Sequence, residues 1–448
     1  MDVRISTMTV LLVTTVVLSP CANAQTSRGK VLTLDEAISL ARSNNRDRKQ
    51  SSLEIGKQTE ALAESKTQFY PRLDASVLAA QLLAPLDFTI KAGQFGTFPG
   101  TGPIPGSNTD LHTPARPIAI ASVTATQPLT QLFRIHLLVS EQRLNVDAAR
   151  LSFDEHGQKL TNDVRRAYYD VLQSQSQHES QESVVKYLNE LQQLTERRLG
   201  QQAALEADKL SVKAEVAKAV YQLTTIEDTL ADRKEALNHL LGRNLETDFS
   251  VESAPESFPE DQDLTTARAT ALEHRPEMKQ AANRMSQAKL ETKIEKTHYI
   301  PDIAIQANYL TTANIDFLPQ NIGSLGALLT WQLWDWGKKR HNVGQDVLAE
   351  KQAALSVEDT REQILLDVDS HFRHLREVRA RLAVIEAERD VEKEKLRNQE
   401  EVYSQQSALL SDLLKQQSSL ANAENDYRQA VLEYWSARAD FQKTLGEE

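Results

Sequence analysis

The sequence predicts a mainly α protein with a small β part, arranged as two copies of one structural repeat. Glycine and proline are scarce, at 15 and 14 of 448 residues, and this composition favours long helices. Proline is absent from Leu129 to Ala254 and again after Pro319. Four short segments of alternating polarity supply the β part.

The first 24 residues have the organisation of a secretory signal peptide. Arg4 precedes an apolar stretch from Met8 to Leu18, and Ala22-Asn23-Ala24 is a cleavage site of small residues. We therefore expect residues 1–24 to be removed. An uncleaved anchor and a lipoprotein that begins at Cys21 are the alternatives. Because Cys21 is the only cysteine, the mature chain is expected to form no disulfide.

Charge and hydropathy exclude two classes of protein. A formal net charge of -12 disfavours non-specific nucleic-acid binding, since nothing would neutralise the phosphates. A mean hydropathy of -0.46 argues against a bundle of transmembrane helices. No apolar run of eighteen residues follows the signal peptide, so any membrane crossing must use strands.

Two gapless offsets relate the halves of the chain. Residues 34–73 match residues 264–303 at an offset of 230, and residues 126–242 match residues 330–446 at an offset of 204. The difference falls between Pro71 and Thr126, where the first copy alone carries a Gly- and Pro-rich insertion from Gly93 to Pro117. Each copy reads as helix, strand, loop, strand, very long helix, turn and helix.

These offsets define the expected organisation. The first repeat, 25–242, contains a β-hairpin at 71–129 with a long external loop, followed by a long helical hairpin. A linker, 243–262, joins it to the second repeat, 263–448, whose β-hairpin is 301–333. The long helix from Leu132 to Leu199 would span about 100 Å, which is too long for a globular core. It must therefore lie in a coiled-coil or barrel-like layer.

The four strands are predicted to have one apolar and one polar face. The apolar positions are Leu73, Ala75, Val77 and Ala79; Val123 and Ala125; Ile303, Ile305, Ala307 and Tyr309; and Leu325, Ala327, Leu329, Trp331 and Leu333. Each segment has about ten residues, the length that a tilted strand needs to cross a bilayer. Trp331, Trp334 and Trp336 cluster at the strand exit as an aromatic girdle would. A half-buried soluble sheet is the alternative.

Four strands are too few to close a barrel, which needs about eight. Open strand edges are not tolerated in lipid, so the chain is expected to oligomerise. A dimer would supply eight strands and a trimer twelve, and the residues alone do not choose between them.

Three motifs carry a resemblance to a known family. They are Leu34-Asp35-Glu36-Ala37, His274-Arg275-Pro276-Glu277 and Leu333-Trp334-Asp335-Trp336-Gly337-Lys338. With the internal repeat, they make the chain from Leu32 to Gly446 resemble the TolC-type outer-membrane efflux proteins, also called outer membrane factors. The resemblance implies a homotrimeric channel-tunnel with a 12-stranded β-barrel and a 12-helix α-barrel.

The resemblance also implies a place in the cell and partners. The barrel would lie in the outer membrane of a Gram-negative bacterium, and the tunnel would extend into the periplasm. A periplasmic adaptor (membrane fusion protein) and an inner-membrane pump of the RND or ABC type would complete an efflux system for small molecules, such as drugs, toxic compounds or metal ions. The alternatives are an exit duct for type I protein secretion and a soluble periplasmic coiled-coil scaffold or adaptor.

The turns at the far ends of the two helical hairpins are candidate sites. The resemblance carries contact with the adaptor's helical hairpin onto Gly200, Ala204, Leu205, Ser404 and Leu409. Small residues at such turns also allow close approach of another hairpin. A tight turn that packs on itself is the alternative.

The resemblance assigns a periplasmic gate to Asp412, Asp208 and Tyr403. Asp412 matches a carboxylate ring at a cation-selecting entrance, and Tyr403 and Asp208 match residues that latch neighbouring tip helices. The sequence departs from the family at two positions, with Lys415 at a second acidic site and Ala408 at a latch arginine. An ion pair between Asp412 and Lys415 on the helix surface is the alternative.

Enzymatic and cofactor-binding motifs are absent from the sequence. Walker, H-E-x-x-H and G-x-S-x-G patterns do not occur. Asp367, His371 and His374 lie at helical spacing, but without a third firm ligand they indicate a solvated helix face. We therefore expect no catalytic, cofactor-binding or metal site.

Overall fold

The computed structural model describes residues 31–201, 205–252, 257–259, 262–315, 318–405 and 409–446. The expected signal peptide, its cleavage site and Cys21 lie outside the described residues. Across the ranges given above, no helix combines the length and the apolar character needed to cross a membrane.

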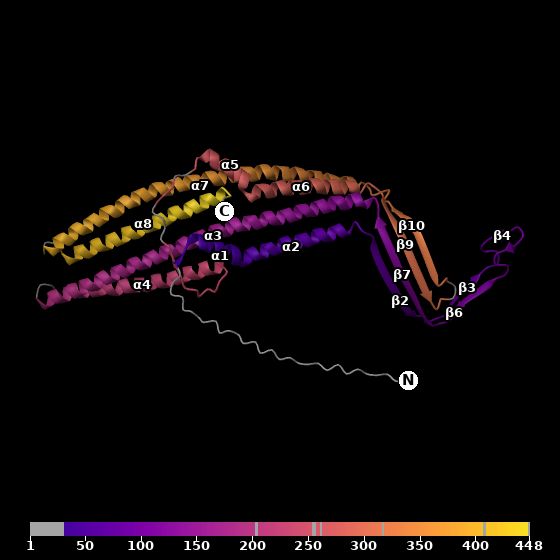
Figure 1. Cartoon of the computed structure of the whole chain (residues 1–448), viewed down its shortest axis with the longest axis horizontal. Coiled ribbons are helices and arrows are strands. Elements are labelled where there is room, and N and C mark those ends of the chain that lie inside the picture. Colours follow the sequence, from indigo (N-terminus) through magenta and orange to yellow (C-terminus); the bar gives the residue numbers. More distant parts are fainter. Residues whose placement is uncertain are drawn as a thin grey trace, which may run out of the picture.

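The chain is elongated, with long helices over most of its length and a sheet at one end (Figure 1). The helices are α1 (Leu34–Asn44), α2 (Arg46–Thr67), α3 (Gln131–Gly200), α4 (Glu206–Leu240), α5 (Leu264–His274), α6 (Pro276–Thr297), α7 (Lys338–Ser404) and α8 (Leu410–Thr444). The mainly α fold with a small β part is therefore confirmed. The helix expected from Leu132 to Leu199 is α3, which is continuous over 70 residues.

Four long strands form one antiparallel sheet at the end opposite the tips of α3, α4, α7 and α8. They are β2 (Arg72–Gln81), β7 (Pro117–Pro128), β9 (Asp302–Ala313) and β10 (Asn321–Thr330), in the spatial order β10-β9-β7-β2. The segment between β2 and β7, which includes the insertion of the first repeat, forms an arm beyond the sheet (Figure 1). It contains β3 (Leu86–Ile90), β4 (Thr97–Phe98), β5 (Gly102–Pro103) and β6 (Thr109–Thr113), and β1 (Val31–Leu32) pairs with β8 (Ser250–Val251) elsewhere.

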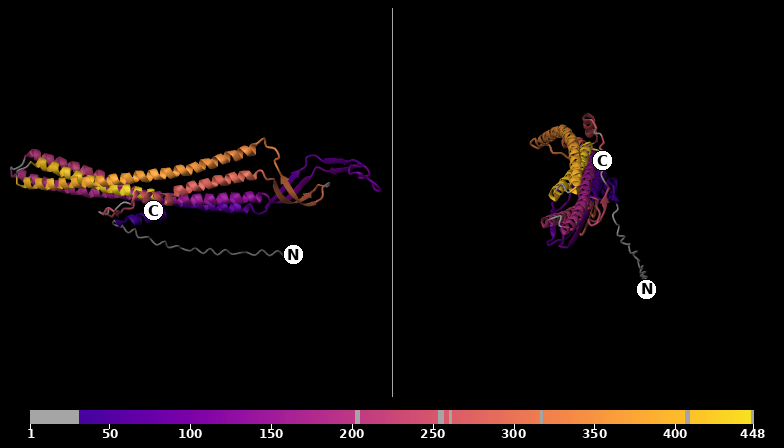
Figure 2. Two further views of the ribbon diagram at one scale, coloured as in Figure 1. Left: turned by 90° about the horizontal axis from the view of Figure 1, so that it is seen from above. Right: turned by 90° about the vertical axis from the view of Figure 1, so that its left-hand side faces the viewer.

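The helices form a layer that is one helix thick and continues the order of the strands. Next to the sheet, α2, α3, α6 and α7 are successive neighbours, and towards the tips the order is α4, α3, α8 and α7. The end-on view in Figure 2 shows that this layer is curved. Because α2 has no buried residue, the layer has no thick core at that edge.

The buried core lies midway along the helices, where α1 and α5 and the ends of α4 and α8 pack onto α3 and α7. Side chains from both repeats meet there, including Val171, Leu237, Val368, Tyr434 and Leu445. The starts of α1 and α2 are capped by side chains: Thr33 accepts the Glu36 N–H at 3.2 Å, and Asn45 accepts the Arg48 N–H at 3.1 Å.

Two glycines occupy equivalent positions in this core. Gly242 follows α4 and Gly446 follows α8, and both have a left-handed φ, of 68° and 77°. A Cβ on Gly242 would lie 2.5 Å from the Asn44 carbonyl oxygen, and one on Gly446 would lie 3.0 Å from the Arg275 amide nitrogen. The residue after each tip hairpin must therefore be glycine, because the junction between the two short helices of its repeat packs directly against it.

Candidate functional site

The register of the sheet places the apolar residues of all four strands on one face. Leu73 faces Ala125, and Val123 faces Tyr309. Tyr309 in turn faces Gly323, in the same register that places Ala307 opposite Leu325. Since side chains alternate between faces along a strand, the alternation of the single strands adds up to one amphipathic sheet.

The opposite face carries most of the polar side chains of the four strands. Ser76 and Ser122 hydroxyls share a hydrogen bond of 2.7 Å, and the Thr124 hydroxyl donates to the Asn308 side-chain oxygen at 3.0 Å. The same face also carries apolar side chains on the two edge strands, among them Leu78 and Leu328. The described chain covers neither face of the edge strands: every residue of β2 and β10 is exposed.

A tight turn joins β10 to α7 and holds the tryptophan cluster. Trp336 and Gly337 both have a left-handed backbone, with φ of 56° and 88°. The Asp335 carboxylate accepts the N–H groups of Gly337 and Lys339, each at 3.0 Å. The rings of Trp334 and Trp336 meet edge to face at 5.8 Å. Asp335 therefore positions the turn. Only its motif was noted in the sequence, although an aspartate directly before Trp-Gly is itself a signal for such a turn.

The far tips hold the predicted adaptor-contact residues, of which Ala204 lies outside the described residues. Gly200 is the last residue of α3, and Leu205 and Leu409 are the exposed residues that precede α4 and α8. The Ser404 hydroxyl donates to the Glu401 carbonyl at 2.7 Å. Leu205 and Leu409 are equivalent at the offset of 204, and the two helical hairpins have their tips at the same end of the molecule (Figure 1).

No hydrogen bond or ion pair joins the predicted gate residues Asp208, Tyr403 and Asp412 to one another within the described part of one chain. The Asp208 carboxylate accepts the Leu205 N–H at 3.0 Å and so caps α4. Tyr403 instead receives a hydrogen bond of 2.8 Å on its hydroxyl from Arg198, whose guanidinium also lies 4.8 Å from the Tyr403 ring centre. Asp412 is exposed in the first turn of α8.

Arg198 was missed by the sequence analysis. It is the last-turn arginine of α3, and with Tyr403 it ties the first helical hairpin to the second near the tips. Burial, followed by the nearby Glu400 and Tyr403, raises the pKa of Tyr187 on α3 to about 12. No sequence signal marked Arg198, because its partner is 205 residues away.

The histidine-containing face of α7 is used by ion pairs. Asp367 accepts a hydrogen bond of 2.9 Å from Arg275, and the His371 ring lies 2.9 Å from the Asp367 carbonyl. Arg275 also pairs with Glu277 at 2.8 Å. Within the part of the chain that the structure describes, no group of three or more His, Cys, Asp or Glu side chains is placed to hold a metal ion.

Comparisons with known proteins agree with this geometry. Residues 267–447 match the sequence profile of the outer membrane efflux protein family. No curated protein matches the chain. Among solved structures, the chain is similar to the outer membrane channel CmeC of Campylobacter jejuni, with 13% identity and a TM-score of 0.75 over 92% of this chain and 85% of that one.

Two further structures give the same result. CusC, a transmembrane channel protein, is 13% identical with a TM-score of 0.74 over 93% of this chain and 92% of that one. The outer membrane protein VceC of Vibrio cholerae is 15% identical with a TM-score of 0.70, over 92% and 96%. These likenesses show that the fold extends over both repeats. The second half of the chain thus matches the outer membrane efflux protein family in sequence, and the chain as a whole has the fold of these outer-membrane channels.

Proposed function

We propose that three copies of this chain form a channel-tunnel in the outer membrane of a Gram-negative bacterium. Twelve strands would close a barrel in the membrane, and the curved helical layers would close a tunnel in the periplasm. The tunnel would receive small molecules, such as drugs, toxic compounds or metal ions, from an inner-membrane pump through a periplasmic adaptor. Conduction through it would be passive, with no catalytic step in this chain.

One observation carries the proposal: the sheet is amphipathic, exposed on both faces and unpaired at both edges. In water, its apolar face would be an aggregation site. In a bilayer, the apolar face would meet lipid and the polar face would line water, provided that the edge strands β2 and β10 pair between copies. The match of residues 267–447 to the outer membrane efflux protein family supports three copies in preference to two.

The remaining candidate residues fit this arrangement. Trp331, Trp334 and Trp336 lie between the sheet and the helices, where the membrane would end on the periplasmic side, and this supports an aromatic girdle. The exposed tip residues Leu205 and Leu409 support adaptor contact. Three copies of the exposed Asp412 would form a carboxylate ring at the tunnel entrance, flanked by the Arg198–Tyr403 tie.

The decisive experiment is purification in detergent, sizing of the complex and conductance in planar lipid bilayers. A trimer that conducts supports the proposal, and a water-soluble monomer without conductance refutes it. Two neighbouring residues of β10 give a matched pair: Leu325 lies on the apolar face and Ser324 on the polar face. An arginine facing lipid at the bilayer centre costs about 2–4 kcal/mol. Leu325→Arg should therefore reduce assembled trimer in outer membranes, whereas Ser324→Arg should preserve it.

A further inference from the structure

The contacts between the two repeats of one chain indicate how two copies of the chain would contact each other. Its two repeats meet at three junctions, where β7 pairs with β9, α3 packs against α6, and α3 packs against α8. In a closed ring of three chains, the second repeat of one copy must meet the first repeat of the next. The elements equivalent to β7 and α3 are then β10 and α7, and those equivalent to β9, α6 and α8 are β2, α2 and α4.

The offsets relate equivalent residues of the two repeats: 230 for the first helix and strand of each repeat, and 204 for the second strand and the helical hairpin. Applying these offsets to a contact, which we call translation, holds in space as well as in sequence. The pair Leu73–Ala125 of the first hairpin becomes Ile303–Leu329, which is a pair observed in the second hairpin. Gly242 likewise becomes Gly446, with the same left-handed backbone and the same packing role. The two β-hairpins therefore pair their strands in the same register, and the two repeats are also equivalent in the core.

Resting on the proposed trimer, we infer that the copies join in the register of the internal junctions. The observed pair Thr124–Asn308 then translates into Leu328 of one copy opposite Leu78 of the next. The pair Val123–Tyr309 translates into Ala327 opposite Ala79. Each strand keeps its apolar face on the same side across this seam, because the translated pairs join residues of equal face.

The translated pairs explain apolar side chains that one chain leaves exposed. The Thr124–Asn308 hydrogen bond of 3.0 Å becomes a contact between Leu328 and Leu78, which are 49% and 57% exposed and lie on the same face of the sheet as Thr124 and Asn308. A polar pair inside the chain is thus replaced by an apolar pair between copies.

At the junction of α6 with α3, one asparagine inside the chain is replaced by a leucine between copies, and the leucine on the other helix is kept. The Asn283 side chain donates to the Leu144 carbonyl at 3.1 Å between α6 and α3, and this contact translates into Leu53 of α2 against Leu348 of α7. These two leucines are 75% and 60% exposed in the single chain. Burying such apolar surface between copies stabilises the assembly by about 25 cal/mol per Å².

Two more contacts translate into complementary pairs. The hydrogen bond of 3.0 Å from Asn162 to Asp440, between α3 and α8, becomes Leu366 of α7 against Ala236 of α4, both exposed in one chain. A hydrogen bond that links the two repeats keeps its chemistry: Gln280 donates to Glu155 at 2.7 Å, and the translated pair is Gln50 with Asp359.

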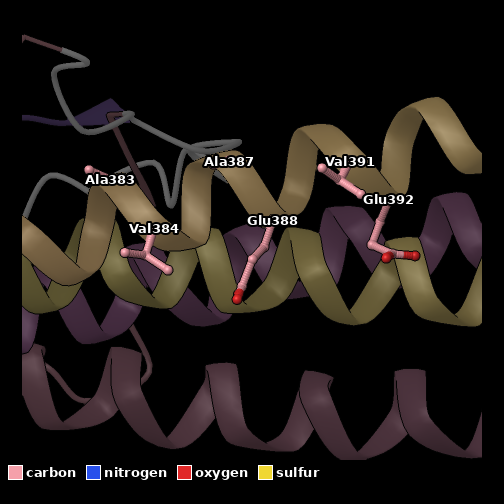
Figure 3. Close-up of a pocket in the computed structure, with 6 residues that line it drawn as sticks. All are labelled: Ala383, Val384, Ala387, Glu388, Val391 and Glu392. Atoms are coloured by element: carbon pink, nitrogen blue, oxygen red, sulfur yellow. The ribbon is translucent and has the colours of Figure 1, made fainter.

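A groove on α7 provides independent support. It has a volume of about 530 Å³ and is lined by Ala383, Val384, Ala387, Glu388, Val391 and Glu392, which Figure 3 shows along one stretch of the helix. The equivalent stretch of α3, with Ser180 and Val184, faces Leu420 and Glu424 of α8 across a shared groove. Translation places Val216 and Val220 of the next copy's α4 over Val384 and Glu388. The occupant of the groove is therefore a second copy of this chain.

Cysteine pairs test the register in the assembled protein. Facing residues of an antiparallel pair have Cβ atoms about 4.5–5.5 Å apart, close enough for a disulfide after a small adjustment. The double variant Leu78→Cys/Leu328→Cys, treated with a mild oxidant, should convert most of the protein into disulfide-linked dimers and trimers in denaturing gels. The two single-cysteine variants set the background.

A matched variant tests the competing register. If β2 and β10 paired with their ends flush, Leu78 would face Ser324, which lies on the same face as Leu328 but about 13 Å away along the strand. Leu78→Cys/Ser324→Cys should therefore stay at the background. In the helices, Leu53→Cys/Leu348→Cys should crosslink, and Leu53→Cys/Leu355→Cys, about 10 Å farther along α7, should not.

The outcomes separate the register from the trimer itself. Crosslinking through Ser324 or Leu355 in place of Leu328 or Leu348, in a protein that still sizes as a trimer, overturns the register and leaves the proposed function standing. A protein that sizes as a monomer removes both. The intrachain pair Thr124→Cys/Asn308→Cys is the positive control for the oxidation, because it forms a disulfide in either case.

Discussion

Replacing Gly242 by alanine should destabilise the centre of the molecule. The added Cβ would lie 2.5 Å from the Asn44 carbonyl oxygen and 2.7 Å from its carbonyl carbon, and both are backbone atoms that cannot rotate away. The junction of α1 and α2 must therefore shift, which strains the hydrogen bond of 3.0 Å from Asn45 to the Leu240 carbonyl.

Two terms set the size of the effect. A left-handed backbone costs an L-residue about 1–2 kcal/mol, and overpacking of a dense core costs about 1–3 kcal/mol, so we expect a loss of about 3 kcal/mol. With an unfolding entropy of about 2 cal/mol/K per residue, the melting temperature of the 448-residue chain should fall by about 3 °C. Gly446→Ala should cost less, because its nearest contact is 3.0 Å.

Thermal unfolding of the detergent-solubilised protein, followed by far-UV circular dichroism, measures these shifts. Gly56→Ala is the matched control, since Gly56 lies inside α2 with nothing within 4 Å of an added Cβ. It should raise the free energy of unfolding by about 0.5–1 kcal/mol. Equal melting temperatures for Gly242→Ala and the wild type would refute the packing argument.

Three further predictions concern the ion pairs and the tips. Burial disfavours ionisation of Glu277, but hydrogen bonds and charge from Arg275 outweigh this effect and lower the pKa of Glu277. The ionised Glu277 should therefore stabilise the fold above its unfolded-state pKa of about 4.3. This stabilisation should disappear as the pH falls through the lower folded-state pKa. The melting temperature of the wild type should therefore exceed that of Glu277→Gln at pH 7 and approach it below about pH 4, and a pH-independent gap would contradict this. Asp412→Ala should raise single-channel conductance and weaken block by divalent cations; unchanged conductance and block would remove Asp412 from the gate. Arg198→Ala should raise conductance more than Tyr403→Phe, which keeps the ring under the guanidinium and loses only the hydroxyl acceptor; equal effects would mean that the hydrogen bond alone maintains the tie.

Local patterns by themselves determined the elements of this protein and their repeat. The proline-free stretches predicted α3 and α7, and period-two polarity predicted the four strands, because both signals depend on neighbours a few residues apart. The offsets predicted that the two hairpins are equivalent, and the structure shows that they share one register. Motifs quoted from the sequence also marked the Trp-Gly turn after β10.

Only the tertiary structure decided which distant residues meet. It placed Arg198, and not Asp208, on Tyr403, and it showed why Gly242 and Gly446 close equivalent core positions. It also placed Leu53, Leu78, Leu328 and Leu348 on exposed edges. The physical reason is that these contacts join residues far apart in the chain, whose proximity follows from the packing of whole helices and the register of whole strands, and neither is written in a local pattern.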